Sequence, residues 1–246
     1  MSSSVISLGL GLGGGKSATS SGRAAGGGAL VNTRSVSFDG TNDYMSVPTN
    51  ASLNTTGDWS FSAWINADDR SSYEAIAAKR TGGLDWQFAA SGSKLTLYLG
   101  TGVQVNGSTS LSTGQWFHVA FTVDVGATGG VKLFVNGSQE SNTGTNTVSS
   151  NNLSAGMTFA DNTVNRWWNG NLDEIAMFHT ALSASDITSI YNSGVPNDIS
   201  SLNPVGWWRM GDGTEAGSGT TIYDMSTNSN NGTLVNGPTF STDVPS

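Results

Sequence analysis

Two tryptophans with polar neighbours are the residues best suited to bind a ligand. Trp86 stands between Asp85 and Gln87, and Trp167 follows Arg166. An exposed indole ring can stack on the face of a sugar or fill a protein contact. We therefore predict a ligand site in which the two indoles form a platform, with hydrogen bonds from Asp85, Gln87, Asn165 and Arg166.

The carboxylates lack the pattern that sugar hydrolysis requires, which is two carboxyl groups that face the sugar together. None of the four glutamates has an acidic residue two positions away. Two histidines and no cysteine leave too few groups for a histidine-rich zinc site or a thiol nucleophile, and we predict that His118 is a packing residue. No G-x-S-x-G motif occurs. We therefore expect a protein that is not an enzyme.

The composition restricts the partners. The 246 residues carry a net charge of -8 with a pI near 4.5, which opposes binding to nucleic acids or anionic membranes because those contacts need clustered Lys and Arg. The absence of cysteine means that no disulfide supports the fold. Only 11% of the residues are charged and 33 are glycines, which suits short strands joined by polar turns.

Residues 1–30 are predicted to be an arm rather than a folded unit. They contain nine glycines and few large side chains, so they cannot bury enough apolar area to fold alone. Lys16, Arg23 and Arg34 are the only charged residues before Asp39, and this basic character favours docking onto an acidic surface. The segment 5–12 alternates with glycine and lacks a basic start, so we do not expect a signal peptide.

From residue 31 onward, short apolar runs separated by turn residues predict β-strands. In strand 116–123, the alternation of Phe117, Val119, Phe121 and Val123 places these side chains on one face. The other predicted strands are 36–38, 59–65, 84–88, 95–99 and 131–135. Hairpin turns are predicted at Asn106-Gly107, Asn136-Gly137, Asn169-Gly170 and Asn231-Gly232, since both residue types tolerate positive φ. The strand tryptophans predicted to pack in the core are Trp59, Trp64, Trp116, Trp168 and Trp207.

One short helix is predicted near residue 185. Ser183 is suited to the N-cap position, and Asp186 stands three residues later as its capping partner. Apolar residues follow at helical spacing until Gly194 ends the run.

Four motifs together resemble the laminin-G-like domains of the concanavalin-A-like lectin and glucanase superfamily. They are SFDGTNDYMSVP (37–48), Trp64, WFHVA (116–120) and GNLDEIAMFHTALSASDITSIYNSG (170–194). The resemblance implies an all-β fold, a jelly-roll sandwich of two antiparallel sheets with one short helix, which binds glycans or proteins rather than turning over a substrate.

The tail of the chain matches the segment that usually opens such a domain. Residues 204–240, which include WWRMGDG, come last here, so we expect a circularly permuted sandwich over 31–246. The strand 207–210 is expected to pair beside the strand around Val36 and to complete the sheet.

The resemblance also implies a calcium ion. Family members often hold calcium between the loop that contains Asp39, Asn42 and Asp43 and a carboxylate that matches Asp173. Carboxylate and amide oxygens are ligands that calcium prefers. The alternative is that Asp39 and Gly40 make a turn and that Asp173 bonds the backbone.

The order of the segments is similar to that of virion structural proteins of marine tailed bacteriophages. This likeness implies a non-catalytic structural or decoration protein, assembled in the bacterial host cytoplasm into a multi-copy virion. Its arm would bind other capsid or tail proteins, and its sandwich would bind host polysaccharide with avidity. The alternative is a free extracellular lectin that binds carbohydrate with the help of calcium.

Overall fold

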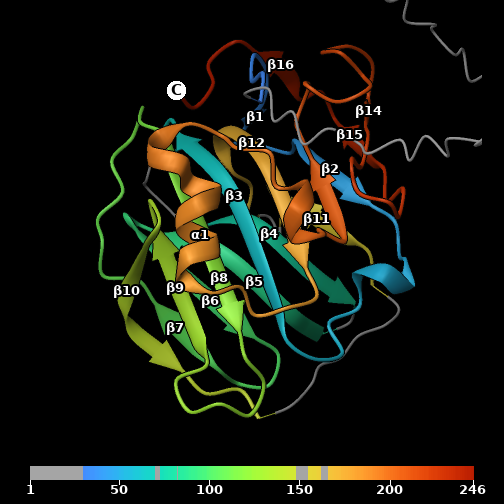
Figure 1. Cartoon of the computed structure of the whole chain (residues 1–246). Helices are drawn as coiled ribbons and strands as arrows, with labels where there is room; N and C mark the ends of the chain where they lie inside the picture. Colours follow the sequence, from blue (N-terminus) through green and yellow to red (C-terminus); the bar gives the residue numbers. More distant parts are fainter. Residues whose placement is uncertain (1–29, 70–72, 82, 148–154, 162–165) are drawn as a thin grey trace, which may run out of the picture.

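Two antiparallel sheets form the described part of the chain (Figure 1). The computed structural model describes residues 30–69, 73–81, 83–147, 155–161 and 166–246. In spatial order the first sheet, sheet A, contains β10 (Ser138–Gly144), β9 (Val131–Val135), β8 (Phe117–Val123), β3 (Trp59–Ala67), β12 (Asn169–Phe178), β1 (Ser35–Asp39) and β16 (Thr239–Ser241), with β13 (Gly206–Trp208) also on β12.

The second sheet, sheet B, packs face to face with sheet A. In spatial order it contains β14 (Thr221–Ile222), β15 (Gly232–Val235), β2 (Tyr44–Val47), β11 (Met157–Phe159), β4 (Tyr73–Thr81), β5 (Gly83–Ser91), β6 (Lys94–Leu99) and β7 (Gln104–Asn106). The predicted all-β sandwich of two antiparallel sheets is therefore confirmed.

Alternating apolar residues build the core between the sheets. Phe117, Val119, Phe121 and Val123 of β8 all belong to it, as their period of two predicts. Phe61 of β3 stacks on Phe121, with 5.7 Å between ring centroids and 15° between ring planes. Trp59, Trp64, Trp168 and Trp207 are buried as predicted, whereas Trp116 is half-buried and donates from Nε1 to a carboxylate oxygen of Asp243 at 3.0 Å.

The predicted helix is α1 (Ala184–Tyr191), and it covers the outer face of sheet A (Figure 1). Ser183 and Asp186 form the predicted capping box. Ile187 and Ile190 pack with Phe134 and Phe178. Three single-turn 3-10 helices are also present, η1 (Ala51–Leu53), η2 (Asn192–Gly194) and η3 (Ser200–Leu202). Within the described residues, no helix is both long and apolar enough to cross a membrane.

The C-terminal tail contributes strands to both sheets. β13 pairs with β12 through Trp208 and Ile175, and β15 pairs with β2 through Leu234 and Met45. The expected pairing of β13 with the strand around Val36 is wrong. β1 and β13 both pair with the edge of β12 that faces away from β3. β1 lies opposite residues 169–172 of β12, and β13 lies opposite residues 175–177. The other edge of β1 pairs with β16.

One of the four predicted hairpin turns is present. Asn136 and Gly137 join β9 to β10 with φ of 48° and 74°, which is the positive φ that this turn requires. The other three predictions are wrong. The Gly107 backbone donates to Leu95 O instead of starting a hairpin, residues 169–170 begin β12, and Gly232 begins β15 directly after Asn231. An Asn-Gly pair permits a tight turn but does not force one.

Candidate functional site

Trp86 lies in the core, so its predicted exposure is wrong. Only 1% of its surface is exposed, and its ring lies 5.3 Å from Trp59 and 5.7 Å from Phe61 between centroids. It is opposite Lys79 and Leu99 on the neighbouring strands, so it points inward with them. The pleat then turns Gln87 to the opposite, outer face of sheet B.

Gln87 lies beside an aromatic pair on that outer face. Its partner across β6 is Tyr98, and the Tyr98 ring lies 6.2 Å from the ring of Tyr73 on β4. The guanidinium carbon of Arg166 lies 5.6 Å from the centroid of the Tyr73 ring, which is a cation–π contact. We call Tyr73, Gln87, Tyr98 and Arg166 the tyrosine patch. Both tyrosines are half-buried and Arg166 is exposed.

Two polar atoms of the tyrosine patch lack hydrogen-bond partners among the described residues. They are the Tyr73 hydroxyl and Gln87 Nε2, and both are buried. Burial raises the pKa of Tyr73, with a further increase from Tyr98, so its hydroxyl stays protonated and can donate. Buried polar groups are almost always bonded, so these two atoms are candidates to bond a water molecule or a ligand.

The other predicted ligand residues, Asp85, Asn165 and Trp167, are not part of the tyrosine patch. Asp85 lies where the β4–β5 pairing is bulged, and burial raises its pKa while the nearby charge of Lys79 lowers it. Trp167 is half-buried, next to the fully buried Trp168. Asn165 lies outside the described residues. The structure thus brings Gln87 and Arg166 together and separates Trp86 from both.

Tyr73 and Tyr98 are the patch residues that the sequence analysis missed. A signal was present for Tyr98, because it alternates with Leu97 and Leu99 in a predicted strand and so had to face outward. Tyr73 had no such signal, since its position opposite Ser91 depends on the β4–β5 register.

A family profile described as the concanavalin A-like lectin/glucanases superfamily, Laminin_G_3, matches residues 39–188, which is more than half of the chain. The chain belongs to this laminin-G-like family. No curated protein sequence is significantly similar to it.

Solved structures share the laminin-G-like fold at low identity. A candidate carbohydrate-binding protein of Bacteroides ovatus has a TM-score of 0.68 at 22% identity, over 88% of this chain and 62% of that one. The heptameric SAP-like pentraxin of Limulus polyphemus has a TM-score of 0.52 at 16% identity, over 67% of this chain and 84% of that one. Domain 4 of the arabinanase AbnA of Geobacillus stearothermophilus, in complex with arabinotriose, has a TM-score of 0.51 at 20% identity, over 64% of this chain and 76% of that one. The chain thus spans less than two thirds of the Bacteroides protein.

The laminin-G-like chain does not assemble the predicted calcium ligands. Asp39 is opposite Asn169 on β12, and Asp173 is four residues further along that strand, so the Cα atoms of Asn169 and Asp173 are about 13 Å apart. The buried Asp173 accepts from Asn32 Nδ2 at 2.9 Å and from the Glu174 backbone at 2.8 Å. No group of three His, Cys, Asp or Glu side chains able to hold a metal is found in the described ranges. The structure therefore does not bring the carboxylates of Asp39, Asp43 and Asp173 together as one group of ligands.

The loop itself follows the turn alternative. Asp39 Oδ1 accepts from the backbone of Thr41 at 2.8 Å and of Asn42 at 3.3 Å, and these bonds lower its pKa. Asp43 Oδ2 accepts from the Asp39 backbone at 3.3 Å, while burial and the charge of Asp39 raise the pKa of Asp43. These oxygens close the turn.

Three of the four glutamates hold structural positions. Glu174 accepts from Arg209 Nε at 2.8 Å and from Trp207 Nε1 at 2.6 Å. Glu140 accepts from the backbone and hydroxyl groups of Ser108 and Thr109. Glu215 Oε1 accepts from the Gly211 backbone at 2.9 Å. Carboxylates bonded in this way anchor loops of the laminin-G-like body.

His118 packs inside the protein, as predicted. It is fully buried, its Nε2 lies 2.8 Å from Ser62 Oγ, and its ring lies 5.4 Å from that of Trp64. Burial lowers its pKa to about 3, so it is neutral at physiological pH.

Proposed function

We propose that this protein is a non-catalytic carbohydrate-binding protein and that the tyrosine patch is its sugar site. The observation that carries the proposal is that two tyrosine rings, a guanidinium and two unpaired polar atoms lie near one another on the outer face of sheet B. Tyrosine rings stack on the C–H face of a sugar, and the hydroxyl, amide and guanidinium groups bond its oxygens.

The relatives support the same class of ligand. The Bacteroides ovatus protein is a candidate carbohydrate-binding protein, and the arabinanase domain holds arabinotriose. The non-catalytic part of the proposal follows from the carboxylates, because Glu140, Glu174 and Glu215 are bonded within the structure and are not adjacent in the sheets as an acid and a nucleophile would be.

The proposal is tested by screening the protein against a glycan array and measuring the best ligand by calorimetry. We expect Tyr98→Ala and Arg166→Gln each to weaken binding by about tenfold or more, which is the effect of losing about 1.4 kcal/mol. Tyr223→Ala, at a tyrosine that is 37% exposed and outside the patch, is the matched control. Equal affinity in Tyr98→Ala and Tyr223→Ala would place the sugar elsewhere, and hydrolysis of the bound glycan would make the protein an enzyme.

We further propose that the sandwich is displayed in many copies on a tailed-bacteriophage particle, with residues 1–30 as its anchor. The support is the composition of those residues, which are glycine-rich and carry Lys16 and Arg23 without any acidic group. Fixing such a segment costs about 1–2 kcal/mol per residue, so it must gain backbone bonds from a partner protein. Many copies would then hold host polysaccharide through weak single contacts.

Antibody labelling of purified particles in electron microscopy tests this placement. We expect regular labelling of the capsid or tail, and loss of the label when residues 1–30 are deleted. Unlabelled particles together with protein in the culture medium would favour the alternative of a free lectin.

A further inference from the structure

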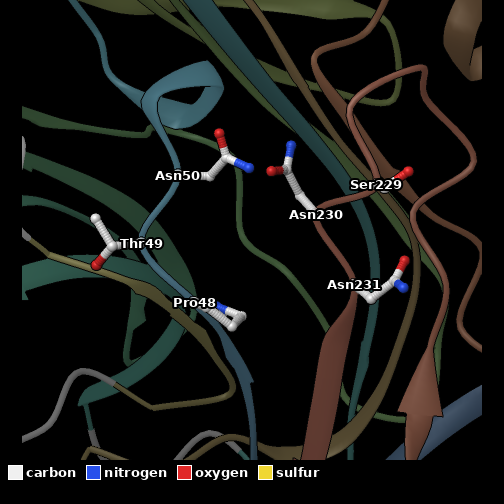
Figure 2. A pocket seen from close by; sticks show the side chains of 6 residues that line it. All are labelled: Pro48, Thr49, Asn50, Ser229, Asn230 and Asn231. Carbon is white, nitrogen blue, oxygen red and sulfur yellow. The ribbon is translucent and has the colours of Figure 1, made fainter.

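A small polar pocket lies beside β2 and β15 of sheet B (Figure 2), whereas the tyrosine patch lies on β4, β5 and β6. Its volume is about 260 Å³. The lining residues come from the segment between β2 and η1 and from the turn before β15, and they are Pro48, Thr49, Asn50, Ser229, Asn230 and Asn231. We call this the amide pocket. Pockets for drug-sized ligands measure about 300–1,000 Å³, so this one suits a smaller molecule.

The pocket exists because two paired strands separate. β2 and β15 are paired from Tyr44 opposite Val235 to Ser46 opposite Thr233. Continuing the same register would bring Pro48 opposite Asn231, but proline has no backbone N–H to donate. The strands diverge at this point, and Figure 2 shows the pocket between the two chain segments.

The amide side chains around the pocket are held in place. Asn50 Oδ1 accepts from the Ser52 backbone at 3.0 Å, as the N-cap of η1. Asn230 Nδ2 donates to Val205 O at 2.9 Å and exchanges hydrogen bonds with the Ser52 hydroxyl. Asn231 Oδ1 accepts from the Asp224 backbone at 3.0 Å. A ligand would therefore meet side chains that are already oriented, which lowers the entropic cost of binding.

These bonds leave a hydrogen-bond donor unused. Asn50 is exposed, and only its Oδ1 is engaged by residues in the described ranges, so its Nδ2 is open to solvent or to a ligand. Figure 2 shows the Asn50 amide pointing across the gap toward Asn230. None of the six lining residues is charged, and Pro48 adds an apolar ring. Amides that donate and accept, with an apolar surface and no charge, match a neutral molecule rich in hydroxyl groups.

We propose that the amide pocket is a second ligand site, which binds one neutral sugar residue. Asn50 donates to a sugar hydroxyl from Nδ2, and the ring of Pro48 contacts the C–H face of the sugar. The site is independent of the tyrosine patch, so either one can fail without affecting the other. With both sites occupied, one chain contacts a polysaccharide at two points, and the second contact becomes intramolecular.

The test follows the side-chain amide NMR signals of asparagine while D-glucose, D-galactose or D-mannose is added to the full chain. We expect shifts at Asn50, Asn230 and Asn231 with a dissociation constant of about 1 mM, the range of a single sugar contact. Asn50→Ser is the informative variant, because serine preserves the N-cap and removes the amide donor. We expect it to weaken binding by about tenfold.

Two controls separate this site from general effects. Asn142→Ser changes an exposed asparagine on β10 and should leave the shifts unchanged, as should Tyr98→Ala in the tyrosine patch. An unchanged dissociation constant in Asn50→Ser, measured from the shifts at Asn230 and Asn231, would overturn the assignment. The absence of shifts at all three asparagines in the unmodified protein would overturn it without any variant.

Discussion

Replacement of Trp208 by alanine tests whether the C-terminal tail is part of the core. Trp208 is fully buried, its ring lies 5.0 Å from that of Phe159, and its Nε1 donates to Asn230 O at 2.8 Å. Deleting a buried tryptophan side chain costs about 3–5 kcal/mol, and the carbonyl left without a donor adds about 1–3 kcal/mol. We expect a loss of at least about 4 kcal/mol of unfolding free energy, a large part of the usual total of about 5–15 kcal/mol.

Urea unfolding followed by circular dichroism measures this loss, and a thermal scan should show a decrease of about 8–16 °C in Tm. Trp208→Phe keeps an aromatic ring and loses the Nε1 bond, so it should cost at least about 1–3 kcal/mol but less than Trp208→Ala. Trp167→Ala, at a half-buried tryptophan, is the control and should cost less than Trp208→Ala. A cost below about 1 kcal/mol for Trp208→Ala would refute the reasoning, because it would mean that the tail does not contribute to the core.

Two further predictions concern pH. Burial raises the pKa of Glu140, but hydrogen bonds from Ser108 and Thr109 outweigh it and lower this pKa below 4.5. The carboxylate therefore stabilises the fold above that pH, and its contribution is lost as the pH falls. When the free energy of unfolding in urea is plotted against pH from 7 to 3, the curve should be flatter for Glu140→Gln than for the unmodified protein, and parallel curves would contradict the assignment. The native His118 binds its proton only near pH 3 while the unfolded chain binds it near 6.5, so stability declines as the pH falls from 6.5 to 3. NMR titration should find this imidazole neutral at pH 5, and a midpoint near 6.5 would disprove its burial.

The periodic parts of the chain were predictable because their signals are local. The strand at residues 117–123 follows its alternation, and α1 begins at the Ser183 and Asp186 capping box. Both signals depend only on residues that are close in the sequence. The Asn-Gly pairs show where local reasoning stops, since the same two residues make a hairpin at 136–137 and start a strand at 169–170.

The candidate site was only partly predictable. Gln87 and Arg166 were identified from their polar character next to tryptophans, yet the aromatic partners in the structure are Tyr73 and Tyr98. The two indoles were expected to be exposed because their neighbours are polar. In a strand, however, side chains alternate between the two faces, so an apolar residue that faces the core has polar neighbours on both sides in the sequence. Trp86 is such a residue.

By itself the sequence determined the family, the two-sheet architecture, the short helix and the burial of the alternating apolar residues, because each depends on spacing along the chain. The tertiary structure alone decided which distant residues meet. The strand register separates Asp173 from Asp39 and brings Tyr73 to Tyr98, and the divergence of β2 from β15 at Pro48 opens the amide pocket. Pairing between segments far apart in sequence sets these distances, and no local pattern encodes them.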